Sequence, residues 1–126
     1  MLFRSQLDPY NFTATFQLGM LAKRDQRFEE ALPLFERSLA LHPGDPSVEY
    51  RIATIQLATD KIEEARRSLE KLAHEWPQFL EAHVSLATIY YRLKLREGGD
   101  RERAIVRRLT AEQDRKAEET GKAARR

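Results

Sequence analysis

Hydrophobic residues along this chain recur at intervals of three and four positions, in stripes that are separated by short polar breaks. One pair of stripes meets at the break KRDQR, residues 23–27, and the next pair meets at ATDK, residues 58–61. Apolar residues at this spacing form one face of an α-helix. Two such stripes on either side of a short break predict two amphipathic helices that fold back on each other as a hairpin.

The hairpin pattern repeats with a period of 34 residues, which is marked by Pro9, Pro43 and Pro77. Small residues at one point of the period would let paired helices approach closely, and a proline ends each return helix because it cannot continue one. Other residues that lie 34 positions apart also match in character, and we call each such group a column. The columns are Leu18, Ile52 and Leu86; Gly19, Ala53 and Ala87; Ala31 and Ala65; Phe28 and Ile62; and Phe35 and Leu69. A fixed period of this length is the signature of a helical array. The predicted fold class is therefore all-α, an α-solenoid of stacked antiparallel helix hairpins.

Six helices are expected, near residues 12–24, 27–41, 46–58, 61–74, 79–95 and 100–117. Asn11 and Asp45 share a column that suits helix N-caps, because their side-chain oxygens can accept from the free N–H groups of the first turn. Asp60 with Glu63 fits a capping box at the start of the fourth helix.

The third hairpin departs from the period in this interpretation. Gly98-Gly99 followed by Asp100 indicates a helix end, a turn and a new N-cap. The loop between the last two helices is then longer, and the small residue of the return helix arrives late, at Ala104 or Ile105.

Short motifs within the period resemble the tetratricopeptide-repeat family, whose signature combines 34 residues with L-G-x2-Y, A-x3-F and a late proline. This chain carries LG at 18–19, ALPLF at 31–35 and LATIY at 86–90. It departs from the family at the early tryptophan, which is replaced by Thr15, Glu49 and His83. The resemblance covers residues 9 to about 111.

The resemblance implies three repeats, at 12–45, 46–79 and 80–113, the third with the longer loop between its helices. An N-terminal stub at 1–11 and a polar C-terminal extension at 114–126 would flank them. Because Leu7-Asp8-Pro9 resembles the tail of an earlier repeat, we expect the C-terminal repeats of a larger bacterial-type tetratricopeptide-repeat protein, with further repeats upstream.

Composition excludes several classes of protein. The 126 residues are 41% hydrophobic and 33% charged, which is too apolar for a disordered chain of this charge. No cysteine is present, so disulfides, thiolate metal sites and a cysteine nucleophile are excluded. No apolar run reaches the roughly 20 residues that span a membrane, and no signal peptide is evident. The default expectation is a cytoplasmic protein with no membrane partner.

Candidate chemistry is sparse. None of His42, His74 and His83 has a second ligand at zinc-site spacing, and no nucleotide-binding or hydrolase motif occurs. The carboxylates fall on charged helix faces. We therefore predict no catalytic residues, no metal, no cofactor and no enzymatic activity.

What remains is the surface of the array. In the family that this chain resembles, the first helix of each repeat lines a concave groove, and the matching positions here are Phe16, Met20, Lys23, Arg24, Tyr50, Arg51, Thr54, Leu57, Thr88, Tyr91 and Arg92. Aromatic, methionine and cationic side chains suit a segment with apolar and some acidic residues. The same aromatics could instead pack between helices. Some family members grip a terminal carboxylate with a lysine and asparagines, but Phe16 and Met20 occupy those positions here.

The predicted function is a protein–protein interaction scaffold that binds a partner segment in this groove. Terminal repeats that stabilise or oligomerise a larger protein are the alternative. RNA binding by the arginine-rich end is less favoured, because acidic residues alternate with the arginines and no aromatic residue is present there to stack on a base.

Overall fold

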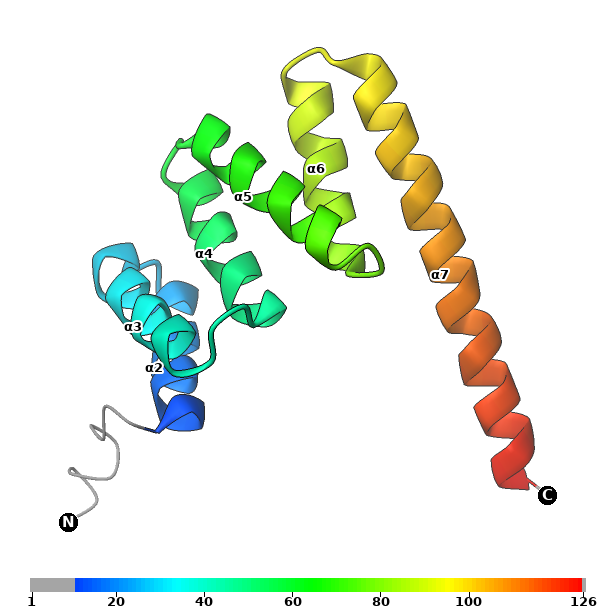
Figure 1. Cartoon of the computed structure of the whole chain (residues 1–126), viewed down its shortest axis with the longest axis horizontal. Helices are drawn as coiled ribbons and strands as arrows, with labels where there is room; N and C mark the ends of the chain where they lie inside the picture. Colours follow the sequence, from blue (N-terminus) through cyan, green and yellow to red (C-terminus); the bar gives the residue numbers. More distant parts are fainter. Residues whose placement is uncertain (1–10, 126) are drawn as a thin grey trace. The chain divides into compact units, whose positions relative to one another are not determined.

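The structure is a computed structural model that describes residues 11–125. This part of the chain holds six α-helices and no strand, so the all-α prediction is confirmed (Figure 1). The helices are α2 (Phe12–Arg24), α3 (Phe28–Leu41), α4 (Pro46–Ala58), α5 (Ile62–Glu75), α6 (Leu80–Arg92) and α7 (Arg96–Arg125). The first four agree with the sequence prediction to within one residue. Of the N-terminal stub expected at 1–11, only residue 11 belongs to the described part of the chain, and residues 1–10 lie outside it.

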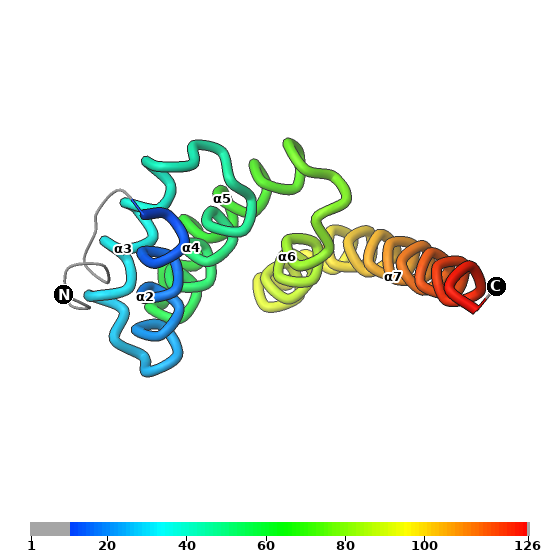
Figure 2. The backbone as a smooth tube through the Cα atoms, turned by 90° about the horizontal axis from the view of Figure 1, so that it is seen from below, coloured from blue at the N-terminus to red at the C-terminus, as the bar shows by residue number. Residues whose placement is uncertain are grey.

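The chain divides into two compact units, one that ends at Ser68 and one that begins at Leu69. In the N-terminal unit α3 packs against both α2 and α4. Its core is a cluster of buried apolar side chains, which are Ala22, Ala31, Phe35, Val48 and Ile55. In the C-terminal unit α6 runs antiparallel to the first turns of α7, as the two perpendicular views show (Figures 1 and 2).

The small residues of the repeat lie where helices approach closely. Ala31, Ala53 and Ala65 are fully buried. Gly19 faces the ring of Phe35, and a Cβ at Gly19 would lie 2.9 Å from Phe35 Cε1. The prediction that these columns are buried between helices is therefore confirmed.

Both predicted N-caps are present. The Asn11 side chain accepts from the backbone N–H of Ala14 at 2.9 Å, and the Asp45 side chain accepts from the backbone N–H of Ser47 at 2.9 Å. Each bond satisfies a donor that the first helical turn leaves free.

The first helix of each hairpin ends in the same way. Gln26, Asp60 and Lys94 adopt left-handed backbone angles, with φ of 61°, 63° and 63°. The next residue in each case donates its N–H to a carbonyl five residues earlier, as in Lys61 to Gln56 at 2.8 Å. This is the Schellman motif, in which a left-handed residue closes the helix. The predicted capping box at Asp60 is wrong, because Asp60 is the left-handed residue of the turn that follows α4, and α5 begins only at Ile62.

The third hairpin keeps the 34-residue period, so the predicted longer loop is wrong. The loop is Leu93–Leu95, and Gly98 and Gly99 lie buried inside α7. Gly99, rather than Ala104 or Ile105, is the small residue of this hairpin. A Cβ at Gly99 would lie 2.6 Å from Tyr91 Cε1, and one at Gly98 would lie 3.1 Å from Tyr90 Cδ2. The glycines therefore make room for two tyrosine rings of α6 and do not end a helix.

The polar C-terminal segment is helical. α7 continues without interruption from Arg96 to Arg125, and nearly all its residues after Leu109 are exposed. Of the two possibilities that the sequence left open, a solvated helix extension and a frayed tail, the structure shows the helix.

The Schellman turns allow a test of the repeat geometry. Asp60→Gly is expected to raise the free energy of unfolding by about 0.5–1 kcal/mol, because a left-handed conformation strains residues other than glycine. Urea unfolding followed by circular dichroism measures the change. Glu64→Gly, at an exposed helical position of α5, is the matched control and should lower stability by about 0.5–1 kcal/mol. Equal losses at both positions would contradict the turn assignment.

Candidate functional site

A hollow of about 360 Å³ lies on the N-terminal unit, where the ends of α2 and α4 meet the start of α3. We call it the α2–α4 hollow. Its lining combines apolar and polar side chains and consists of Met20, Lys23, Arg24, Gln26, Phe28, Thr54 and Ala58. Four of the predicted groove residues, Met20, Lys23, Arg24 and Thr54, are thus brought together in one concavity.

Lys23, which lines this hollow, is partly buried and senses a second cation on α4. Burial lowers the pKa of Lys23 below its usual 10.5, and the positive charge of Arg51 lowers it further. Arg51 comes from α4, and its guanidinium carbon lies 5.4 Å from the centroid of the Tyr50 ring. Its Nε atom is buried and has no hydrogen-bond partner within residues 11–125. Burial is thus the main cause of the lowered pKa of Lys23, and the positive charge of Arg51 adds to it.

Nearby acidic residues are engaged elsewhere. Asp25 lies 3.8 Å from Arg24 and 3.7 Å from Arg27, and Glu30 lies 3.1 Å from Arg27. None of the ion pairs found within the described chain includes Lys23 or Arg51. The exposed arginines are thus paired while the two less exposed cations are not.

The predicted aromatic residues of this unit have packing contacts as well. Phe16 lies edge-on to Phe35 with ring centroids 5.6 Å apart and stacks on Phe12 at 5.8 Å. Tyr50 and Leu57 are half-buried on α4. Phe16 therefore belongs to the core of the hairpin, and a role for it in binding stays a prediction.

The helical pairs with 34-residue spacing match a known family. Residues 22–78, from α2 to the turn after α5, match the family model of the tetratricopeptide repeat. The chain is a tetratricopeptide-repeat protein. The family inferred from the LG, ALPLF and LATIY motifs is therefore confirmed.

Other proteins that contain this repeat resemble the chain over part of its length. The TPR repeat-containing thioredoxin TTL4 of Arabidopsis thaliana is 31% identical over 75 residues, which are 60% of this chain and 11% of that protein. The structure of MamA from Desulfovibrio magneticus RS-1, residues 41 to the end, superposes with a TM-score of 0.75 at 21% identity, over 86% of this chain and 61% of that one. A second MamA crystal structure gives 0.71 at 20% identity, over 89% and 64%. The tetratricopeptide-repeat fold is in general that of a protein-interaction scaffold, with an extended binding surface.

The remaining predicted groove residues, Thr88, Tyr91 and Arg92, lie on α6 in the C-terminal unit. Tyr91 covers Gly99 with its ring and donates its hydroxyl to Asp100 Oδ1 at 2.6 Å. Thr88 and Arg92 are exposed. The structure thus gives Tyr91 a role in holding α6 against α7, and binding by these three residues stays a prediction.

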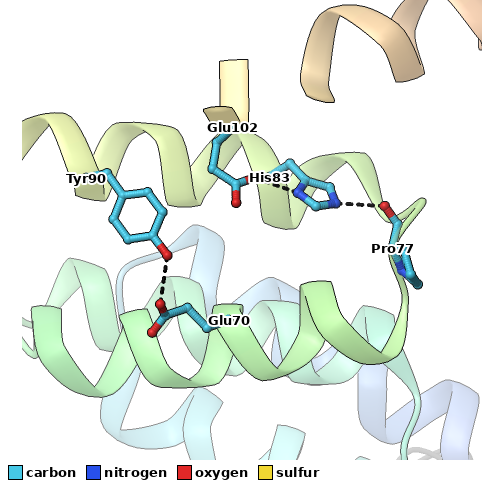
Figure 3. Close-up of polar contacts among 5 residues, drawn as sticks. All are labelled: Glu70, Pro77, His83, Tyr90 and Glu102. Carbon is cyan, nitrogen blue, oxygen red and sulfur yellow. Dashed lines mark hydrogen bonds and ion pairs between the residues drawn. The ribbon is translucent and has the colours of Figure 1, made fainter. Parts of the chain in front are cut away.

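The C-terminal unit of the repeat protein contains a polar contact that no sequence pattern had indicated. His83 is only 5% exposed. Its Nδ1 lies 2.6 Å from Glu102 Oε2 and its Nε2 lies 2.7 Å from the carbonyl oxygen of Pro77 (Figure 3). Both partners are acceptors, so the imidazolium, with an N–H on each nitrogen, satisfies both. In the same region the Tyr90 hydroxyl donates to Glu70 at 2.7 Å.

The other two histidines take no part in the contact that His83 makes with Glu102 and Pro77. His42 stacks on Phe12 with ring centroids 3.7 Å apart, and His74 is exposed. Within residues 11–125 no three histidine or acidic side chains gather where they could hold a metal ion. No described helix has both the length and the apolar character that a membrane crossing requires.

Proposed function

We propose that the N-terminal unit of this tetratricopeptide-repeat protein binds a segment of a partner protein in the α2–α4 hollow, without catalysis. The supporting observation is the lining, in which Met20, Phe28 and Ala58 supply apolar surface next to Lys23 and Arg24. Its volume of about 360 Å³ falls in the range of protein ligand sites, roughly 300–1,000 Å³.

Two side chains that line the hollow also pack against the core of the N-terminal unit. Met20 and Phe28 contact the buried cluster of Ala22, Ala31 and Phe35, and these contacts restrict their positions. Side chains that are already ordered lose little further entropy when a partner binds. Met20 adds an adaptable apolar contact because its side chain is unbranched and polarisable.

Site-specific photo-crosslinking tests this proposal. A photoreactive amino acid replaces Thr54, which lines the hollow, and in a control protein it replaces Arg37, which is exposed on α3 outside that lining. Irradiation in cell extract is expected to link a specific protein to position 54 and not to position 37. Mass spectrometry identifies the linked segment, and nuclease treatment should leave the product intact.

A second variant checks that the captured segment occupies the hollow. Met20→Glu places a charge in the apolar lining and should abolish cross-linking from position 54. Cross-links that are equally abundant from both positions, or that persist with Met20→Glu, would contradict the proposed site.

A further inference from the structure

A second hollow, of about 430 Å³, lies at the turn between α5 and α6 in the C-terminal unit. It is lined by Glu75, Trp76, Pro77, Gln78 and Phe79, and we call it the Trp76 pocket. These residues belong neither to the lining of the α2–α4 hollow nor to the groove positions predicted from the sequence. We propose that the Trp76 pocket binds an arginine side chain of a partner protein.

Two aromatic side chains supply most of the apolar surface of this pocket. Trp76 is 46% exposed although its ring is large and mainly apolar, and Phe79 is half-buried. The faces of aromatic rings carry partial negative charge and attract cations, those of tryptophan most strongly. A guanidinium is planar and stacks on such a face, whereas an ammonium is a compact, strongly hydrated charge. The rings therefore favour a cation over a neutral group, and arginine over lysine.

The charge at the pocket also complements arginine. Among the five lining residues, Glu75 contributes a carboxylate, and it is the last residue of α5, where the negative end of the helix macrodipole lies. Lys71 lies 4.0 Å from this carboxylate, but the side chains of Lys71 and Glu75 are 70% and 42% exposed, so their pairing is weak. Because a carboxylate has two oxygens that both accept hydrogen bonds, Glu75 can also pair with a guanidinium.

Phe79 occupies a position that local structure does not favour for phenylalanine. It is the N-cap of α6 and makes no side-chain capping hydrogen bond. At the equivalent position 34 residues earlier, Asp45 accepts from the backbone N–H of Ser47 at 2.9 Å. A helix without a capping side chain is less stable. Departures from such local rules are expected at functional sites, which supports a binding role for the Phe79 ring.

Hydrogen bonds hold the turn in place before a ligand arrives. The Trp76 N–H donates to the Leu72 carbonyl at 2.8 Å, and the Phe79 N–H donates to the Trp76 carbonyl at 3.0 Å. The carbonyl oxygen of Pro77 lies 2.7 Å from Nε2 of the buried His83 (Figure 3). A turn that is already ordered loses little entropy when it binds a partner.

The fluorescence of Trp76, the single tryptophan of the chain, tests the proposal directly. The probe is a pool of nine-residue peptides, acetylated and amidated at their ends, with a central arginine and without aromatic residues. Two matched pools carry lysine or citrulline at the centre, since citrulline is a neutral isostere of arginine. Acetyl-arginine amide serves as the free side chain. The arginine pool is expected to change Trp76 emission at concentrations about tenfold lower than the citrulline pool or acetyl-arginine amide requires, and about threefold lower than the lysine pool requires.

Two glutamine substitutions on α5 locate the charge effect. Glu75→Gln should weaken binding of the arginine pool by about threefold or more, because it removes the counter-charge. Glu64→Gln is the matched control. It removes the same charge from an exposed position of the same helix outside the lining, so it should change binding by less than about 1.5-fold.

Two substitutions of Trp76 test stacking, with calorimetry as the measurement because they remove the fluorophore. Trp76→Leu should weaken binding of the arginine pool by about fivefold and reduce its advantage over the citrulline pool. Trp76→Phe keeps an aromatic ring and should retain most of the binding. Both variants should melt close to the temperature of the unmodified chain, because Trp76 is largely exposed.

The arginine pool must bind more tightly than both matched pools, and equality with either would overturn the proposal. Equal losses from Glu75→Gln and Glu64→Gln, or unchanged binding by Trp76→Leu, would also overturn it. Acetyl-arginine amide that binds as tightly as the arginine pool would show that the pocket takes a free cation and not a partner segment. Thr54 and Met20, which test the α2–α4 hollow, lie outside this lining, so either proposal can fail alone.

Discussion

Phe35→Ala is expected to lower the free energy of unfolding by about 3–5 kcal/mol, the usual range for truncation of a buried phenylalanine. The Phe35 ring is fully buried and fills the space left open by Gly19 on α2. It also receives the edge of Phe16 at 5.6 Å between centroids. Since Gly19 has no side chain to move inward, the cavity would persist. Urea unfolding followed by circular dichroism measures the loss.

A double-mutant cycle with Gly19→Ala separates this explanation from a general loss of apolar area. Gly19→Ala alone places a methyl group 2.9 Å from the ring and should destabilise the unit. In the Phe35→Ala background the clash is absent and the methyl group fills part of the cavity, so the same substitution should stabilise. Additive effects of the two changes would show that Gly19 and Phe35 do not pack as described.

His83→Ala should lower the free energy of unfolding by a similar amount, about 3–5 kcal/mol, because it removes one partner of a buried charged pair. The Glu102 carboxylate, whose side chain is 15% exposed, would lose its counter-charge. The Pro77 carbonyl would lose its donor at the same time. Trp76, the single tryptophan of the chain, precedes Pro77, so its fluorescence during urea unfolding reports on this region directly.

The charge pair itself can be isolated with Glu102→Gln. This substitution keeps the size of the side chain and an oxygen acceptor for Nδ1, but it removes the negative charge. The double variant His83→Ala with Glu102→Gln should be less destabilised than the sum of the two single variants, because no uncompensated carboxylate remains. A His83→Ala protein that unfolds at the same urea concentration as the unmodified chain would refute the role assigned to this contact.

The local sequence was sufficient for most of the helices. Apolar spacing located α2 to α5 to within one residue, and Asn11 and Asp45 marked two N-caps, because periodicity and capping depend on residues close together in the chain. The same kind of reasoning failed at Gly98-Gly99. Two glycines before an aspartate favour a turn locally, but here the rings of Tyr90 and Tyr91 need the space that a side chain would take.

The sequence by itself determined the repeat, the family and the helix that carries each candidate side chain, since a 34-residue period constrains every equivalent position at once. Only the tertiary structure decided which charges meet. It brought the charge of Arg51 close enough to act on Lys23, paired Arg24 with Asp25, and joined His83 to Glu102 across 19 positions of sequence. Such contacts depend on how neighbouring helices pack against each other and on which side chains their burial leaves without water. Neither property is contained in the spacing of residues along one helix.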